Sequence, residues 1–254
     1  NGQINAMYNY GCLLYHSEGT SMNKKEACRY YKMAADKGHM LSTYACACML
    51  STGDGVAINK EEAARYMKIA ADKGQINAMY AYGLSLYEGD GVEMNKEEAC
   101  RYFKMAADQG MAEAIYNYAL MLYNGEGVPM NKEEAGRYYK IVADKGEIQA
   151  MFNYGLMLSK GDGVSTNKTA ACRYFKMAAD KGNTNAMVNY GNMLEDGEGV
   201  SMNKTEGSRY FKIAADKGNI EAIYNYGVAL FNGHGVKMNK KEAGRYYKMA
   251  ADKG

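Results

Sequence analysis

The sequence predicts an all-α solenoid of seven 36-residue helix-turn-helix repeats. The main observation is a tripeptide with a fixed period. Asp-Lys-Gly stands at 36–38, 72–74, 144–146, 180–182, 216–218 and 252–254, with Asp-Gln-Gly at 108–110. A period of this length is the signature of stacked repeats. Two further observations agree: helix-capping residues recur with the same period, and the alternation typical of strands appears nowhere in the 254 residues.

The period divides the chain into one array without insertion or linker. The repeats are 3–38, 39–74, 75–110, 111–146, 147–182, 183–218 and 219–254. Each unit of a solenoid packs only on its neighbours, so we expect one quasi-linear domain. The array starts and stops within the pattern and has no polar capping repeat. We therefore expect it to be a fragment of a longer chain.

The sixth copy shows the elements of one repeat in order. Its first helix covers 185–194 and ends at the turn Gly-Glu-Gly-Val at 197–200, where glycine supplies the positive φ of a tight reversal. Asn203 then caps the second helix, and Glu206 three residues later completes a capping box. This helix ends at Gly218. Isolated helices this short are marginal in water, so stacking must stabilise them.

The same cap recurs in every repeat. The cap residues are Asn23, Asn59, Asn95, Asn131, Asn167, Asn203 and Asn239. Glu follows three residues later except in the fifth repeat, which has Ala170. Seven equivalent caps predict seven equivalent second helices.

The second helix has a buried stripe and a polar arc. In the first repeat Ala27, Tyr30, Tyr31 and Ala34 follow the i, i+3, i+4, i+7 spacing of a core-facing stripe. The tyrosine column is unbroken: Tyr30, Tyr66, Tyr102, Tyr138, Tyr174, Tyr210 and Tyr246.

The polar arc carries an arginine column. Three of its members have a glutamate four residues earlier, and we expect ion pairs there: Glu61–Arg65, Glu97–Arg101 and Glu133–Arg137. The column is either a binding ladder or a solvated convex face, and we favour the solvated face.

These motifs resemble those of the Sel-1-like repeat family, relatives of the tetratricopeptide repeat. The resemblance rests on Ala-x-x-x-Tyr-Gly, Gly-x-Gly-Val and Glu-Ala-x-Arg-Tyr-Tyr-Lys-x-Ala-Ala-Asp-Lys-Gly, and covers essentially the whole chain. It implies a right-handed α/α superhelix whose first helices line a concave groove, and an adaptor that assembles complexes. The first two repeats depart from the pattern, at 17–20 and at 43–47.

The first helix has two different arcs. On a helical wheel Ala6, Met7, Tyr10 and Leu14 share one arc, which we expect in the core. The opposite arc carries Asn5, Tyr8, Asn9, Cys12 and Tyr15, and the family geometry turns it toward the groove.

Residues on the groove arc of the later repeats are our candidates for partner binding. They are Tyr80, Tyr87, Tyr116, Asn117, Tyr123, Asn153, Asn189, Tyr224 and Asn225. Tyrosine offers a rigid amphipathic contact, and an asparagine amide both donates and accepts, so it can pair with a peptide backbone. The alternative is that the tyrosines only fill the gap between successive first helices. Alanine at Asn117, Asn153 and Asn189 should abolish binding and keep helicity.

Composition excludes several function classes. With 31 basic and 29 acidic residues the net charge is +2, too balanced for a nucleic-acid-binding surface. No apolar run approaches the roughly 20 residues that span a bilayer, so we expect no membrane insertion. The three histidines and the pair Cys46 and Cys48 lack metal-ligand spacing, and no phosphate-binding loop or nucleophile constellation is present, so we expect no cofactor.

The cysteines indicate a reducing environment. Cys12 and Cys48 share one column of the repeat, and Cys28, Cys100 and Cys172 share another. Equivalent residues of adjacent repeats lie about 10 Å apart, a helix diameter, whereas a disulfide needs Cα atoms within about 7 Å. We expect six free thiols and a cytoplasmic protein.

The sequence thus predicts a non-enzymatic scaffold that binds an extended peptide or a partner surface. An alternative is a structural spacer that self-associates end to end through exposed apolar faces. A remote alternative comes from the resemblance, because some cysteine-rich members of the family have been associated with β-lactam-type compounds. This chain lacks their paired-cysteine framework.

Overall fold

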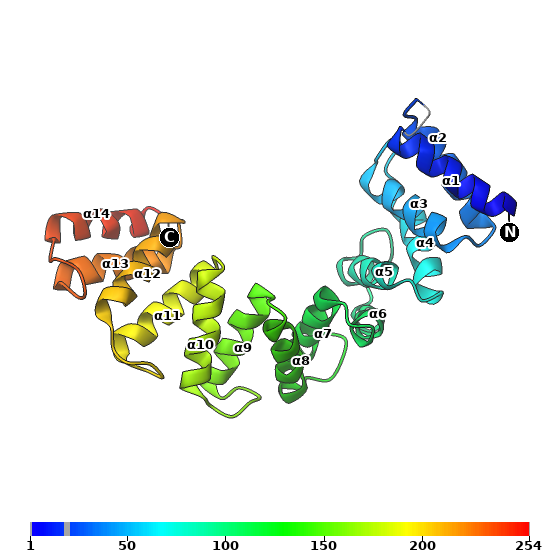
Figure 1. Cartoon of the computed structure of the whole chain (residues 1–254). Helices are drawn as coiled ribbons and strands as arrows, with labels where there is room; N and C mark the ends of the chain where they lie inside the picture. Colours follow the sequence, from blue (N-terminus) through cyan, green and yellow to red (C-terminus); the bar gives the residue numbers. More distant parts are fainter. Residues whose placement is uncertain (1, 18–20, 254) are drawn as a thin grey trace. The chain divides into compact units, whose positions relative to one another are not determined.

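The computed structural model describes residues 2–17 and 21–253, and over this part of the chain it confirms the all-α repeat prediction. Three residues of the divergent first loop, 18–20, lie outside the described residues. The described helices form seven consecutive pairs (Figure 1). They are α1 (Gly2–His16), α2 (Lys24–Asp36), α3 (Met40–Thr52), α4 (Lys60–Asp72), α5 (Ile76–Glu88), α6 (Lys96–Asp108), α7 (Ala112–Asn124), α8 (Lys132–Asp144), α9 (Ile148–Lys160), α10 (Lys168–Asp180), α11 (Thr184–Asp196), α12 (Lys204–Asp216), α13 (Ile220–Asn232) and α14 (Lys240–Ala251).

The helices group into two compact units. The N-terminal unit, Asn1–Met130, contains α1–α7, and the C-terminal unit, Asn131–Gly254, contains α8–α14. Within each unit every helix packs on the next one along the chain, which is the packing order of a solenoid. A side chain on a first helix therefore contacts its own second helix and the adjoining repeats.

The predicted asparagine caps are present in all seven second helices. Asn23 accepts from the amide of Glu26 at 3.0 Å, and Asn167 caps Ala170 at 2.9 Å without a glutamate. The backbone N–H of the cap residue donates to the preceding first helix and not to the glutamate of a capping box. In the second repeat Asn59 N–H donates to the carbonyl of Leu50 at 2.9 Å. Each such bond ties the start of a second helix to the preceding first helix.

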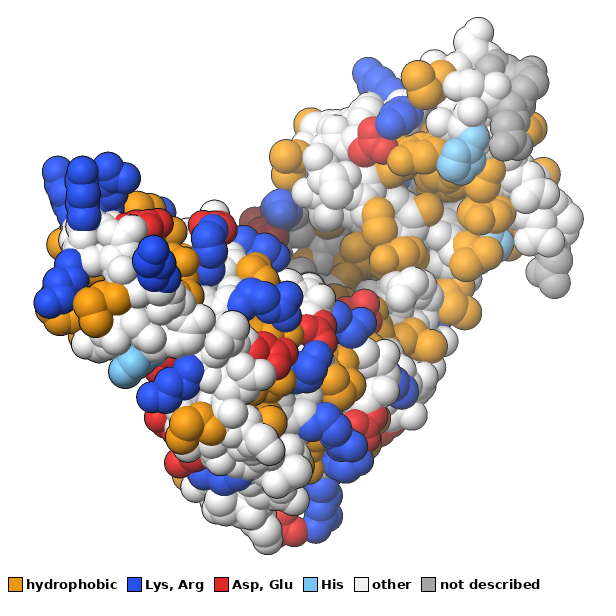
Figure 2. Space-filling model, turned by 60° about the vertical axis from the view of Figure 1, so that its left-hand side comes forward, with side chains coloured by type: hydrophobic (Ala, Val, Ile, Leu, Met, Phe, Trp, Pro, Cys, Tyr) orange, Lys and Arg blue, Asp and Glu red, His pale blue; other side chains and the backbone are white. Residues whose placement is uncertain are grey.

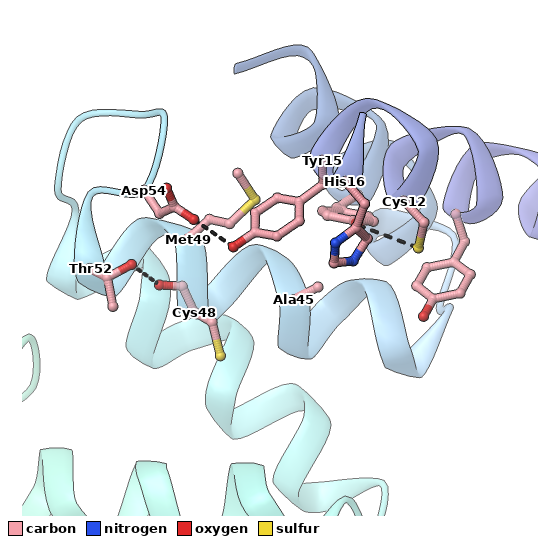
Figure 3. Close-up of a pocket in the computed structure, with 10 residues that line it drawn as sticks. Cys12, Tyr15, His16, Ala45, Cys48, Met49, Thr52 and Asp54 are labelled. Atoms are coloured by element: carbon pink, nitrogen blue, oxygen red, sulfur yellow. Dashed lines mark hydrogen bonds between the residues drawn. The ribbon is translucent and has the colours of Figure 1, made fainter. Parts of the chain in front are cut away.

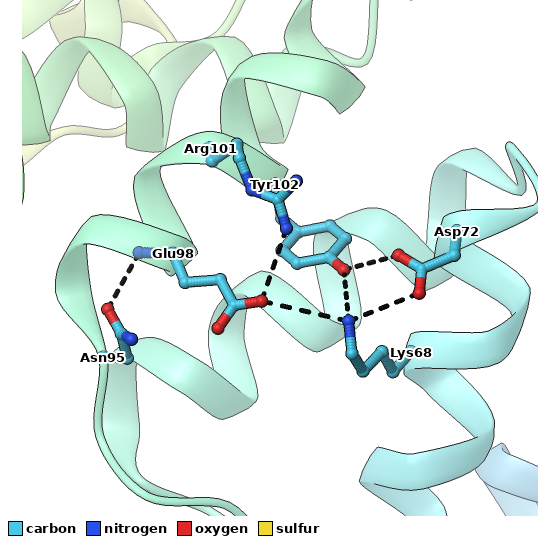
Figure 4. Close-up of polar contacts among 6 residues, drawn as sticks. All are labelled: Lys68, Asp72, Asn95, Glu98, Arg101 and Tyr102. Carbon is cyan, nitrogen blue, oxygen red and sulfur yellow. Dashed lines mark hydrogen bonds and ion pairs between the residues drawn. The ribbon is translucent and has the colours of Figure 1, made fainter.

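The tyrosine column is buried and joins neighbouring repeats. Tyr102 of α6 is fully buried and donates to Asp72 Oδ1 at the end of α4 (2.6 Å), while Lys68 Nζ donates to the same hydroxyl at 3.1 Å (Figure 4). Lys68 also pairs with Asp72, at 3.3 Å. Bonds of the same type join Tyr66 to Asp36, Tyr174 to Asp144 and Tyr210 to Asp180, at 2.8, 2.6 and 2.7 Å.

The predicted core arc of the first helix is correct in interior repeats but not in the first. Tyr82 of α5 is only 5% exposed and its ring lies beside Lys68 of α4. In α1 the equivalent Tyr10 is 40% exposed and Ala6 is also exposed, because α2 is the described helix on which α1 mainly packs. Leu14 is buried as expected, since it faces its own repeat.

Two of the three predicted arginine pairs are wrong in spacing. Arg137 pairs with Glu133 as expected, but Arg101 contacts Glu98 at 3.3 Å, an i, i+3 pair (Figure 4). Arg65 likewise lies 3.7 Å from Glu62. The guanidinium groups of Arg65 and Arg101 lie over the next tyrosine ring, which draws them away from the glutamate four residues earlier. These side chains are exposed, as a solvated face requires.

Candidate functional site

Packing leaves four positions of each first helix half-exposed in most repeats, and we call them the first-helix face. In α5 these positions are Tyr80, Ala81, Leu84 and Tyr87, and the same positions recur at intervals of 36 residues. The inward positions of α5 are Ala78, Met79, Tyr82 and Leu86, all buried. The nine residues that the sequence predicts for partner binding all lie on this face.

The asparagines of the face contact neighbouring helix residues. Asn225 Nδ2 donates to Asn192 Oδ1 of α11 at 3.4 Å. Asn189 donates to the carbonyl of Asn185 in its own helix at 2.9 Å. Asn117 of α7 donates to the hydroxyl of Tyr80 in α5 at 3.2 Å. These three amides and that of Asn153 are half-buried.

Tyr80 is held between two repeats. Its ring lies 5.8 Å from that of Phe103 in α6, and its hydroxyl accepts the bond from Asn117. Burial raises the pKa of Tyr80, so the phenol stays protonated and is able to donate. Tyr80 is half-buried, so the side chain both fills the space between first helices and contributes to the surface.

The hydroxyl of Tyr87 makes a hydrogen bond to the next repeat. Its hydroxyl donates to Glu126 Oε2 at 2.8 Å, Lys96 Nζ donates to the same oxygen at 2.6 Å, and the lysine lies 5.0 Å from the ring centre. The bonds from Lys96 and Tyr87 hold the pKa of Glu126 below its ordinary value. Tyr15, Lys24 and Asp54 repeat this arrangement between the first and second repeats.

The remaining predicted tyrosines differ in exposure. Tyr116 and Tyr123 of α7 are half-buried, whereas Tyr224 of α13 is 54% exposed. The ring of Tyr224 lies 6.0 Å from that of Tyr247 in α14. Tyr224 is therefore the most accessible aromatic residue among those predicted.

The first helices are almost free of ionised side chains. α1 and α3 contain no Asp, Glu, Lys or Arg, and α5, α7, α9 and α13 contain one each. The charges lie mainly on the second helices and in the loops. In Figure 2 hydrophobic side chains gather on the N-terminal unit, while Lys and Arg side chains are scattered over the C-terminal unit.

A pocket of about 640 Å³ lies between α1 and α3. Its lining residues are Tyr8, Cys12, Tyr15, His16, Tyr31, Ala45, Cys48, Met49, Thr52 and Asp54. Figure 3 shows their side chains running from Asp54 through Tyr15 and His16 to Cys12. Tyr8, Cys12, Tyr15, Ala45 and Cys48 occupy first-helix-face positions, yet the sequence analysis selects no residue of these two repeats.

Small residues in α3 explain why this pocket exists. Ala45 and Cys48 occupy the positions that Asn117 and Leu120 occupy in α7. The shorter side chains of Ala45 and Cys48 leave more space against α1 than Asn and Leu would at these positions. The smaller side chains at these two positions were the signal in the sequence from which the pocket could have been predicted.

In the sixth repeat an acid replaces the tyrosine of the first-helix face, and a histidine replaces the acid of the following loop. Glu195 of α11 stands where α5 has Tyr87, and His234 replaces the loop acid that corresponds to Glu126. Burial raises the pKa of Glu195, with attraction to His234 and Lys204 opposing the effect. Its Oε1 is buried with no hydrogen-bond partner among the described residues.

The described residues offer neither a metal centre nor a membrane-spanning helix. No cluster of three or more His, Cys, Asp or Glu side chains suits a metal ion there. None of the helices in that part of the chain is long and apolar enough to cross a membrane. All six cysteines are free, as expected, and Cys12 and Cys48 line the same pocket.

Comparison with known families gives a consistent match. The sequence model of the Sel1 repeat matches seven successive segments: 4–39, 41–75, 76–111, 112–147, 148–183, 184–219 and 220–254. Comparison with curated protein sequences gave no match.

Two solved structures are similar over nearly the whole chain. One is c5321, a protective antigen of uropathogenic Escherichia coli strains with an SLR fold, at a TM-score of 0.89 and 25% identity. The match covers 98% of this chain and 54% of that protein, so the chain spans about half its length. The other is a Sel1 repeat protein from Oxalobacter formigenes, with a TM-score of 0.79, 27% identity and coverage of 99% and 72%.

Proposed function

Because this chain belongs to the Sel1 repeat family, whose members commonly mediate protein interactions, we propose that it is a non-enzymatic scaffold. Its first-helix face binds an extended segment of a partner protein. The partner contacts several successive repeats within a unit, and each repeat contributes a small part of the affinity.

One observation carries this proposal: the first-helix face consists mainly of tyrosine, asparagine and apolar residues, with few charges. Binding surfaces are enriched in tyrosine and depleted of charge at their centres. The second helices carry the opposite composition, with Arg and Lys in every copy. A surface needed only for solubility would have similar charge on both sets of helices.

The asparagines suit the backbone of an extended peptide. In the C-terminal unit Asn153, Asn189 and Asn225 recur at the same position of α9, α11 and α13. Asn189 and Asn225 donate their hydrogen bonds from the amide nitrogen, and the carbonyl oxygen of each amide is the group that would accept from a peptide N–H. Tyr224 adds an exposed aromatic contact next to this row.

A peptide-library selection tests the proposal. The chain is panned against unstructured peptides, and variant N153A/N189A/N225A serves as the counter-screen. Alanine has the higher helix propensity, so the variant should keep its helicity. We expect peptides that bind the parent and not the variant. If no sequence is enriched on the parent, the first-helix face does not bind extended peptides.

A second candidate function is stacking of copies through α1 and α14. Tyr10 and Leu13 of α1 are 40% and 38% exposed, and Met249 of α14 is 44% exposed. Exposed apolar side chains favour association with another surface. Light scattering tests it: a mass that rises with concentration, and that falls back in variant Y10K/M249K, supports stacking, and a constant monomer mass contradicts it.

A further inference from the structure

We propose that the pocket between α1 and α3 holds an uncharged aromatic side chain of the partner polypeptide. This inference rests on the proposed function and names the residue type that the N-terminal unit recognises. It concerns the first two repeats, in which the sequence analysis selects no binding residue. Four features of the pocket support it: fixed walls, an aromatic and sulfur-rich lining, neutral charge and suitable volume.

The walls of the pocket are held by contacts that its lining residues make with one another. Tyr15 donates to Asp54 at 2.6 Å, and its ring packs edge-on against His16, with centroids 4.9 Å apart. Tyr31 donates to Cys12 Sγ at 3.4 Å, and Tyr8 lies 6.0 Å from the Tyr31 ring. Because these side chains are already ordered, an occupant does not bear the entropy cost of fixing them.

The lining favours an aromatic occupant over an aliphatic one. Three tyrosine rings lie within reach, and rings attract one another in edge-on and offset arrangements. Cys12, Cys48 and Met49 add sulfur atoms, which make favourable contacts with ring edges. An aliphatic side chain would gain burial but neither of these interactions.

The charge of the pocket excludes an ionised occupant. The helices that form most of it, α1 and α3, contain no Asp, Glu, Lys or Arg. The acid among its residues, Asp54, pairs with Lys24 at 2.6 Å. Bonds from Lys24 and Tyr15 hold the pKa of Asp54 low, so it stays an anion already neutralised by its partner. An incoming charge would lose hydration without gaining a counter-ion.

The volume admits a large side chain. About 640 Å³ lies inside the range of roughly 300–1,000 Å³ typical of ligand pockets. The chain itself supplies the residues that should fill this space: Asn at position 45 and Leu at position 48, as in Asn117 and Leu120 of the fourth repeat. The filled variant uses residues already compatible with this helix position.

Methionine-methyl NMR tests the proposal, because Met49 lines the pocket. The chain is labelled with ¹³C-methyl methionine, and the Met49 signal is assigned with Met49→Leu. N-acetyl-L-tryptophanamide is the aromatic probe, and N-acetyl-L-lysinamide and N-acetyl-L-glutamic acid amide are charged comparisons. The filled variant is A45N/C48L. The matched control is Ala81→Asn, the same change at the same position of the next repeat.

We expect the Met49 signal to shift saturably with the tryptophan probe in the parent and in A81N. In A45N/C48L half-saturation should need at least tenfold more probe, and the charged probes should give no saturation. Nuclear Overhauser contacts between indole protons and the Met49 methyl in the parent provide a readout that needs no variant. No saturable shift in the parent, or equal shifts in A45N/C48L, would overturn the proposal.

The two proposals fail in different ways. Selected peptides that bind the parent and A45N/C48L equally would contradict the aromatic pocket and would leave the proposed peptide binding by the first-helix face standing. A saturable Met49 response without any enriched peptide would contradict the proposal that the chain binds extended peptides. It would show only a pocket for small molecules, which also contradicts the inference that the pocket holds a side chain of the partner. Enriched peptides with a recurring Trp, Tyr or Phe that bind A45N/C48L at least tenfold more weakly support both.

Discussion

The hydroxyl of Tyr102 donates to Asp72 at 2.6 Å and thereby joins the second helix of one repeat to that of the repeat before it. The phenol is fully buried, and the carboxylate stands in the recurring Asp-Lys-Gly tripeptide at the helix end. The same bond recurs in both units. The residues that define the repeat in the sequence therefore also connect successive repeats.

Tyr102→Phe should destabilise the N-terminal unit. A hydrogen bond to a charged group contributes about 1.5–3 kcal/mol, and the partial exposure of Asp72 places the expected loss near the lower end. The control is Tyr30→Phe, because Tyr30 is partly exposed and makes no hydroxyl hydrogen bond among the described residues. Urea unfolding followed by circular dichroism measures both. Equal losses in the two variants would mean that the bond to Asp72 contributes nothing.

Asp144 should make the C-terminal unit sensitive to acid. Bonds from Lys140 and Tyr174 hold the pKa of Asp144 below its ordinary value of 3.8. The folded state therefore favours the carboxylate, and this stabilisation is present above about pH 4 and lost as the pH falls through the lower folded pKa. Asp144→Asn should be less stable than the parent at pH 7, and the difference should shrink toward pH 2. A difference independent of pH would contradict this linkage.

Glu195 should show the opposite pH dependence. Burial raises its pKa, so the folded state favours the protonated form. This favourable contribution is complete below about pH 4.5 and is lost as the pH rises through the raised pKa. Glu195→Gln should therefore be more stable than the parent at pH 7, by about 1 kcal/mol for a buried unpaired oxygen, and similar to it at pH 4. Thermal unfolding at both pH values measures this.

The control for Glu195 is the adjacent exposed acid, Asp196. Asp196→Asn should change stability little at either pH. If Glu195→Gln is less stable than the parent at pH 7, the carboxylate has a favourable partner and the account of this position is wrong.

Gly91→Ala should disrupt the junction between the second and third repeats. The φ of Gly91 is +75°, and an added Cβ would lie 2.2 Å from the carbonyl oxygen of Lys60. Gly74 provides a matched control, since its φ is +92° but nothing lies within 4 Å of an added Cβ. Gly74→Ala should cost about 1–2 kcal/mol through the left-handed backbone alone. Gly91→Ala should cost clearly more, because backbone must move, and equal costs would exclude the close approach.

The sequence predicts the helices well because their signals are local. A cap such as Asn59 and the glycines of the turn act within a few residues, so a single copy of the repeat is enough to identify them. The bond between Tyr102 and Asp72 spans 30 residues, and no helical wheel of one helix displays it. Asp72 also pairs with Lys68, four residues earlier in the same helix. This local pair accounts for the acid at position 72 without any contact to another repeat, so the sequence gives no reason to look for one.

The candidate site is less predictable because the sequence of one repeat does not show which side chains contact the neighbouring repeats. Tyr87 has the composition of a binding residue, but its hydroxyl is used by Glu126 of the next repeat. Ala45 and Cys48 look unremarkable in the sequence, and they form a pocket only because the tyrosines of α1 wall the opposite side. Contacts between repeats decide which face residues remain available to a partner.

We propose that the first-helix face binds the partner segment and that the second helices do not. The most direct measurement is calorimetric titration of one selected peptide into the parent, N153A/N189A/N225A and a second-helix variant, R173A/R209A, from the same unit. We expect at least a tenfold loss of affinity for the asparagine variant and no more than a twofold change for the arginine variant, with circular dichroism unchanged in both. Unchanged affinity for the asparagine variant, or a loss confined to the arginine variant, would contradict it.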